Sequence, residues 1–341
     1  MTNLFRRLIL YSCIRTNVAK LSDKSVRLPV HGTQTKEKPK ERFLTYIFTR
    51  YVNLVKIYEE TFPSAAKFYK TFSTGIKLFK DDGLQLFQAY KKSNSHTIHS
   101  LTRKELEIFH EMPMNMVKVA PIIVIGTTLP FGAAIFAVGC MFPKTTLSHH
   151  FWSDEQKEEF ALIDHKRKIK LYKPLLSYMC CRMNYVKESS IKYQFASLLE
   201  DLEKGINPQI ETILKCKQIF EEAPFSIQHL STSHVSLLIR LHNLHRGWRR
   251  KMRLKEFAGI VKAMDSAILK EGGLETLSLS DLRRACFFRG LNPIDLSNED
   301  IIVWLKNWLT ISRELDVDSY SLLLHCPVLL SYNAPTNVAL L

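Results

Sequence analysis

The feature that most constrains this chain is one long stretch without charge. Residues 119–143 (VAPIIVIGTTLPFGAAIFAVGCMFP) contain no Asp, Glu, Lys, Arg or His, and Lys118 and Lys144 flank them. At a rise of about 1.5 Å per residue, such a stretch can cross a hydrocarbon core of roughly 30 Å as one tilted helix. We therefore predict a single transmembrane helix within residues 117–143, with a kink near Pro130.

The interior of this stretch indicates an anchor rather than a transport pathway. Pro121 and Pro130 would be costly in a soluble helix, but membrane helices tolerate proline because neighbouring groups satisfy the freed carbonyls. An ion path or proton relay normally needs an ionisable side chain, and the stretch has none. The alternative is a buried hairpin of two helices in a soluble protein, with its turn at residues 129–132.

The N-terminus has the composition of a targeting signal. Residues 1–28 hold six cations and a single acid, Asp23, and several apolar side chains can share one helical stripe. That combination is typical of a mitochondrial presequence, whereas a secretory signal needs a longer apolar run. We assign residues 1–40 to a presequence followed by a polar segment without regular structure; the alternative is a disordered basic tail.

Residues 41–116 are predicted to form amphipathic helices before the membrane. Residues 41–90 contain 12 of the chain's 36 aromatic side chains, with lysines between them. The segment RFLTYIFTRYVNLVKIY has helical periodicity, and Pro63 marks the start of a second helix. Helices of this kind suit a membrane interface rich in anionic lipid such as cardiolipin, or they form a small core or pack on a partner.

The rest of the chain is predicted to be an all-α domain over residues 144–330, followed by a tail over 331–341. No alternating strand pattern competes with the helical periodicity. Ser153 and Ser280 are expected N-caps, and Gly205, Gly272 and Gly290 are expected helix stops. The predicted helices cover residues 154–169, 171–178, 189–204, 208–220, 229–244, 250–269, 280–289 and 298–312.

One segment of this domain is a candidate binding site. Within HRGWRRKMRLKEF, six cations fall in ten residues beside Trp248, in a chain whose net charge is +15. The cations are Arg246, Arg249, Arg250, Lys251, Arg253 and Lys255. Such a patch suits the phosphates of ribosomal RNA or of lipid head groups, with the indole available for stacking. The alternative is a solvated helix face.

Catalytic, metal and cofactor sites are not predicted. Four histidines (His229, His234, His242 and His245) precede the patch, but no carboxylate or cysteine with ligand spacing completes a site. The seven cysteines form no CxxC pair, which argues against a zinc ribbon. No phosphate-binding glycine loop, nucleophile elbow or HExxH motif occurs, so we predict no enzyme.

Several blocks, in order along the chain, resemble a known family. The block LTRKELEIFHEMPMNMVKVAPIIVIGTTLPFGAAIFAVGCMFPKTTL, with Phe151 and Trp152 after it, resembles the membrane segment of the LETM family of mitochondrial inner-membrane proteins. The later blocks MRLK, ILKEGGLETL, LRRACFFRGL, LKNWLTIS and SLLLHC resemble that family's soluble domain, which is likened to a ribosome-binding fold. The resemblance covers roughly residues 100–330, and the short layout is most similar to the LETM-domain-containing protein 1 branch.

The resemblance implies one inner-membrane helix, a C-terminal helical domain in the matrix, and a link to mitochondrial ribosomes and respiratory-chain biogenesis. RNA would then be contacted only through the ribosome. The alternative implied by longer relatives is a component of proton-coupled K⁺ or Ca²⁺ exchange, working as a homo-oligomer. Those relatives carry an acid soon after the Pro-Phe pair of the span, where this chain has residues 132–134 as Gly-Ala-Ala, and this chain lacks an EF-hand loop.

Overall fold

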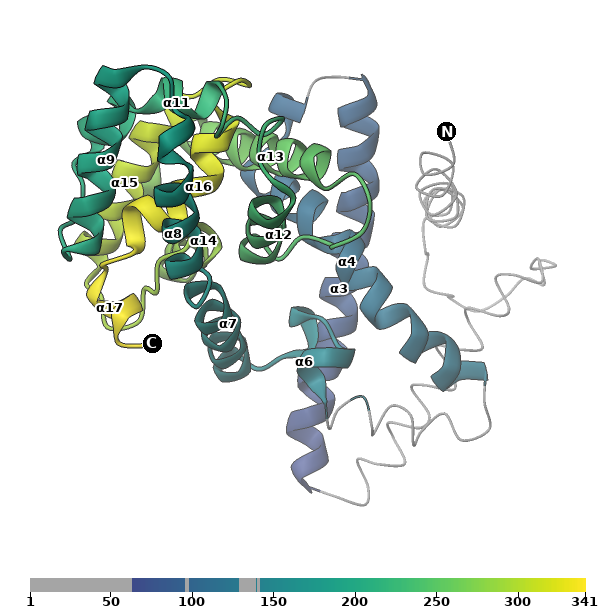
Figure 1. Ribbon diagram of the computed structural model, residues 1–341. Coiled ribbons are helices and arrows are strands. Elements are labelled where there is room, and N and C mark those ends of the chain that lie inside the picture. Colours follow the sequence, from purple (N-terminus) through teal and green to yellow (C-terminus); the bar gives the residue numbers. More distant parts are fainter. Residues whose placement is uncertain (1–62, 96–97, 129–138, 140–141) are drawn as a thin grey trace, which may run out of the picture. The chain divides into compact units, whose positions relative to one another are not determined.

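The computed structural model describes residues 63–95, 98–128, 139 and 142–341, and no strand occurs among them (Figure 1). The all-α class is therefore confirmed for the described part of the chain. Its contacts divide the chain into two compact units. Unit 1 comprises residues 1–97 and 107–157, and unit 2 comprises residues 98–106 and 158–341.

Unit 1 is built on two long helices and a short turn. Helix α3 (Pro63–Ser95) begins at the proline that was predicted to start it, and α4 (Arg103–Thr128) supplies most of its length to the same unit. After them come α6 (Pro143–Thr146) and the 3₁₀ turn η2 (His149–Phe151). Apolar side chains of Val119, Leu147 and Phe151 are buried together, and the α3 residues Ile76 and Phe79 pack on them.

The predicted transmembrane segment overlaps α4 without matching its ends. Helix α4 continues through Lys118 and contains Pro113 and Pro121, so no helix end marks the predicted boundary at residue 117. Among the described residues, none of the helices is both long enough and apolar enough to span a bilayer. The predicted kink at Pro130 lies outside the described residues.

Unit 2 contains a succession of short and medium helices. The major ones are α7 (Asp154–Ile169, which begins in unit 1), α8 (Tyr172–Arg182), α9 (Ser189–Glu203), α10 (Ile210–Lys215), α11 (Lys217–Glu221), α12 (Thr232–Leu241), α13 (Arg250–Lys270), α14 (Leu279–Arg289), α15 (Asn298–Glu314), α16 (Tyr320–Ser331) and α17 (Pro335–Val338). Short 3₁₀ turns lie at η1 (Ile98–Ser100), η3 (Met183–Tyr185) and η4 (Leu274–Thr276).

The core of unit 2 lies around α13 and α16, which pack on each other (Figure 1). Helix α16 is buried on nearly all sides, as expected for a helix whose sequence, YSLLLHCPVLLS, is apolar all round. Helix α13 also packs on α12 and α15. One continuous apolar core therefore holds the N-terminus of α13 in a defined place, and that N-terminus carries the predicted binding patch.

Most predicted helices of unit 2 are present, with corrected boundaries. The segment 208–220 is two helices, because α10 ends at Lys215 and α11 starts at Lys217. The segment 229–244 shortens to α12, since Ser231 caps its start and a turn follows at His242. Helix α16 was not among the predicted helices. Residues 335–338 of the predicted tail form α17, where Asn337 is fully buried.

The predicted caps were right in four cases of five. Ser153 Oγ accepts a hydrogen bond from the Gln156 N–H, and Gly205, Gly272 and Gly290 follow their helices with positive φ. The prediction for Ser280 was wrong. Ser278 is the N-cap of α14 and accepts from the Asp281 N–H, so the helix starts one residue earlier than predicted.

Three predictions are not tested by the described part of the structure. The presequence (residues 1–40) and the first aromatic helix lie outside the described residues. The domain boundaries at residues 116, 143 and 330 also stay predictions.

Candidate functional site

The predicted basic patch lies where the loop after α12 enters α13. Arg249 is the N-cap residue of α13 and adopts a left-handed conformation, with φ 60° and ψ 38°, which is uncommon for a residue other than glycine. The Arg253 guanidinium turns back from the first turn of the helix and donates to the backbone carbonyls of Gly247 and Trp248. It also contacts His245 Nδ1 at 3.0 Å. Arg253 therefore fixes the shape of the loop.

Two other cations of the patch are also used inside the fold. Arg250 Nη1 donates to Ser236 Oγ of α12 at 2.7 Å, and Lys251 Nζ donates to the Gln228 carbonyl at 2.5 Å. Both residues are half-buried. Together with Arg253, they join the start of α13 to the elements before it, so their first role is structural.

The remaining three cations are exposed. Arg246, Arg249 and Lys255 face solvent, and the Trp248 side chain between them is 78% exposed. Arg249 Nη2 lies 2.7 Å from Met252 Sδ, a side chain one turn further along α13. We call Arg246, Trp248, Arg249 and Lys255 the outward basic set.

The position of this set at a helix N-terminus has an electrostatic consequence. The first turn of α13 has no acidic residue and no side-chain cap, so its N–H groups carry the positive end of the helix dipole. Of the outward basic set, Arg249 lies at the N-cap itself, where its charge repels that positive end at a cost of about a few tenths of a kcal/mol unless an anion neutralises it. The arrangement suits a phosphate-bearing partner, since such a partner relieves the repulsion.

The four histidines near the patch do not come together. His229 contacts Ser226 Oγ, and His245 contacts Arg253. His242 Nε2 donates to the Leu324 carbonyl at 3.0 Å, and His234 is buried against His325. Each imidazole therefore has its own partner within the fold, and these four residues do not form one metal site.

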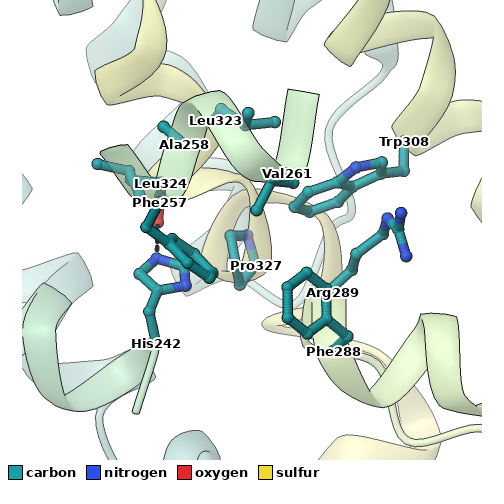
Figure 2. A pocket seen from close by; sticks show the side chains of 10 residues that line it. All are labelled: His242, Phe257, Ala258, Val261, Phe288, Arg289, Trp308, Leu323, Leu324 and Pro327. Carbon is teal, nitrogen blue, oxygen red and sulfur yellow. Dashed lines mark hydrogen bonds between the residues drawn. The ribbon is translucent and has the colours of Figure 1, made fainter. Parts of the chain in front are cut away.

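A pocket between α13 and α16 is too small for a ligand. His242, Phe257, Val261, Phe288 and Pro327 line it with other apolar side chains (Figure 2). It has room for about one water molecule, far below the volume of a small-molecule site. We therefore read it as a packing defect of the core.

Beside that pocket lies a buried polar centre that the sequence did not reveal. Asp265 Oδ1 accepts from Arg289 Nε at 3.1 Å and from Arg289 Nη2 at 2.6 Å. Its Oδ2 accepts from Trp308 Nε1 at 3.0 Å and Ser312 Oγ at 2.6 Å. Asp265 and Arg289 are 2% and 4% exposed, so this network joins α13, α14 and α15 rather than facing a substrate.

A second basic surface was not predicted from the sequence. Five cations fall in eight residues at the end of α7 and the start of α8: Lys166, Arg167, Lys168, Lys170 and Lys173. Arg167 pairs with Asp164 and Lys168 donates to the Phe287 carbonyl, while the other three lysines are exposed. The density of cations in the sequence would have been enough to predict this surface. Unlike the segment 246–255, it has no tryptophan beside it.

A third group missed from the sequence lies in unit 1. Asp82 of α3 and the adjacent His149 and His150 of η2 place their ligand-type atoms within 4.8 Å of one another. They are separated by 67 positions in sequence, so no ligand-spacing motif could have indicated them.

Comparison with known proteins places these features in a family context. A family model described as "LETM1-like, RBD" matches residues 101–329. The protein named LETM1 domain-containing protein 1 from Xenopus tropicalis is 30% identical over 280 residues, which cover 81% of this chain and 80% of that protein. Its namesakes from Homo sapiens and Bos taurus are 26% and 25% identical, covering 80% and 78% of this chain and 77% and 75% of their own lengths.

Proposed function

Since the chain belongs to the LETM1-like family, we propose that it is a non-enzymatic mitochondrial membrane protein whose unit 2 binds the mitochondrial ribosome. Through that contact it supports the assembly of inner-membrane complexes and respiratory function. The observation that carries the proposal is the outward basic set at the start of α13, inside the region that matches a family model abbreviated RBD, which we read as ribosome-binding domain.

The chemistry of the outward basic set fits ribosomal RNA. Arg246, Arg249 and Lys255 can neutralise backbone phosphates, and each such contact releases counterions from the nucleic acid. The exposed Trp248 indole offers a flat face on which an unstacked base can lie. Because Arg253 holds the loop by its backbone carbonyls, the set does not have to order itself on binding, which lowers the entropic cost.

The membrane part of the proposal rests on sequence. We propose that one helix within residues 119–142 anchors the chain in the inner membrane, that residues 1–40 direct it to mitochondria, and that unit 2 lies in the matrix. The uncharged stretch and the basic, acid-poor N-terminus support this arrangement. The same stretch lacks an ionisable residue, so proton-coupled exchange is the weaker alternative.

The proposal is tested by co-sedimentation of the full chain, in mild detergent, with mitochondrial ribosomes over a salt series. The test variant combines Arg246→Glu, Arg249→Glu and Lys255→Glu. The matched control combines Lys166→Glu, Lys170→Glu and Lys173→Glu, which makes the same change of net charge on the second basic surface. Arg250, Lys251 and Arg253 stay unchanged because their contacts hold the fold.

We expect the test variant to bind ribosomes weakly and with a salt slope smaller by about 2 to 3, since each lost phosphate contact removes about 0.7–0.9 from the slope. The control variant should keep the affinity and slope of the original chain. Equal ribosome binding by the original chain and both variants would show that the outward basic set does not contact the ribosome. Equal loss in both variants would show that net charge alone drives the association.

A further inference from the structure

Unit 1 contains a cluster of metal-ligand side chains that the proposed function does not use. Asp82 comes from α3, and His149 and His150 come from the η2 turn that packs on it. His150 Nε2 and Asp82 Oδ2 are 2.9 Å apart, and the two imidazole rings stack with centroids 4.0 Å apart. Two elements far apart in sequence therefore bring two imidazoles and one carboxylate to one place.

We propose that Asp82, His149 and His150 bind one divalent transition-metal ion, with Zn²⁺ the first ion to test. Two imidazoles and one carboxylate are a ligand set that suits Zn²⁺ and its neighbours, and water would complete a tetrahedral sphere. Mg²⁺ and Ca²⁺ prefer a sphere of oxygen ligands, which this cluster does not offer.

The geometry needs only a small adjustment to accept the ion. In a tetrahedral zinc site, ligand atoms about 2.0–2.2 Å from the metal lie roughly 3.3 Å from each other. The His150 and Asp82 atoms are already 2.9 Å apart, and the largest separation within the cluster is under 4.8 Å. Binding of the ion would require the other ligand atoms to move closer to one another by at most about 1.5 Å.

The surroundings hold His150 in position. Its side chain is 3% exposed, its Nδ1 lies 2.9 Å from Ser148 Oγ, and the Phe79 ring packs edge-on against it. When Nε2 binds the metal, the Nδ1–H donates a hydrogen bond to Ser148 Oγ, and a hydrogen bond of this kind orients a metal-bound histidine. A Cβ at Gly75 would lie 2.7 Å from the His150 carbonyl, so only glycine lets α3 approach this closely.

Charge around His149 is compatible with metal binding. The two nearby ammonium groups have their own acceptors, since Lys118 donates to the Lys144 carbonyl and Lys157 to Asp154.

The competing interpretation is that Asp82 and His150 form only a structural hydrogen bond between α3 and η2. The two interpretations differ for His149, whose Nδ1 lies 3.4 Å from Asn115 Nδ2, a long distance for a hydrogen bond. A structural bond does not need His149, whereas a metal site does.

The test uses the full chain in mild detergent, stripped of metal with a chelator and titrated with Co²⁺, whose d–d absorption reports tetrahedral coordination. Zn²⁺ affinity is then measured by competition, and Mg²⁺ serves as the ion that should not bind. The variants are Asp82→Asn and His149→Gln, which keep the size of the side chains, and the control is His99→Gln, which removes an exposed imidazole elsewhere.

We expect one equivalent of Co²⁺ with d–d bands in the original chain and in the control, displaced by Zn²⁺ and not by Mg²⁺. Zn²⁺ should raise the Tm of these two proteins, and both site variants should lose affinity by at least about tenfold. Absence of d–d bands in the original chain, or equal Zn²⁺ affinity in all four proteins, would overturn the proposal. If Asp82→Asn fails to fold, the original chain and His149→Gln still decide it. Ribosome binding by unit 2 is independent of either result.

Discussion

At the scale of single residues, the stability of unit 2 depends most visibly on Asp265. Its carboxylate accepts four hydrogen bonds, two of them from Arg289, and both side chains are almost fully buried. A buried ion pair of this kind gains little over apolar packing, but removing one partner leaves the other charge without compensation.

We predict that Asp265→Asn lowers the free energy of unfolding of unit 2 by about 3–5 kcal/mol, because Arg289 would stay buried without its counter-ion. Urea denaturation of the full chain, followed by tryptophan fluorescence, to which Trp308 of the network contributes, measures the effect. Asp318→Asn, at an exposed position, is the control and should change stability by less than about 0.5 kcal/mol. Equal effects of the two substitutions would contradict the structural role of Asp265.

Three buried histidines of unit 2 make its stability depend on pH. Burial is the main cause that lowers the pKa of His165 and His325 to about 4 and of His234 to about 2. His234 and His325 are also joined by a hydrogen bond of 2.8 Å between their Nε2 atoms. In the unfolded chain the same imidazoles have pKa values of about 6.5.

We therefore predict that unit 2 loses stability as pH falls below about 6.5. Between about pH 6.5 and 4, the unfolded chain binds more protons than the folded one, so the free energy of unfolding rises with pH, by up to about 1.4 kcal/mol per pH unit for each proton. Urea midpoints from pH 7.5 to 4.5 measure this slope. The double variant His234→Leu and His325→Leu should show a shallower slope, and an unchanged slope would exclude the pair as its source.

At the scale of elements, the start of α14 offers a sharp test of local structure. The sequence pattern indicated Ser280 as N-cap, because a serine directly before Asp281 resembles a capping signal. The structure instead has Ser278 Oγ accepting from the Asp281 N–H at 3.2 Å, three residues ahead, as a capping side chain requires.

We predict that Ser278→Ala destabilises unit 2 by about 1 kcal/mol, because one N–H group at the helix start loses its acceptor. Ser280→Ala, two residues away and inside the first turn, should cost less than about 0.5 kcal/mol. Both values come from urea denaturation of the full chain. A larger cost for Ser280→Ala than for Ser278→Ala would show that the cap is assigned to the wrong serine.

Helical periodicity in the sequence predicted most of the helical segments. It did not predict the features that depend on tertiary packing, which are helix α16 and the break between α10 and α11. The predicted bounds of helices α7, α9, α13 and α15 agree with the structure to within two residues. Helix α16 has no polar face to reveal a period, since its surroundings bury it on nearly all sides. The break at Cys216 between α10 and α11 carries no glycine or proline signal.

The candidate sites show a similar division. The basic segment 246–255 could be found from cation density, but its separation into structural and outward-facing members could not. Arg250, Lys251 and Arg253 are structural only because Ser236, Gln228 and the carbonyls of residues 247 and 248 lie within reach after folding. The cluster of Asp82 with His149 and His150 depends on the packing of α3 on η2, which no local pattern encodes.

At the scale of the whole molecule, the sequence indicated the family but not the division into units. The predicted boundaries at residues 117 and 144 followed hydropathy. The assignment of residues to the two structural units changes within α4, at residue 107, and within α7, at residue 157, and both helices continue unbroken through those positions. Backbone hydrogen bonding continues along a helix regardless of which unit its side chains contact.

The central claim is that an anchor in the inner membrane holds the helical unit 2 on the matrix side, where ribosomes are. Protease protection of the full chain with a C-terminal tag tests this most directly, in intact mitochondria, in mitoplasts with the outer membrane opened, and after detergent lysis. We expect the tag to survive in mitochondria and in mitoplasts and to be digested only after lysis. Digestion of the tag in mitoplasts, with the inner membrane still closed, would contradict it.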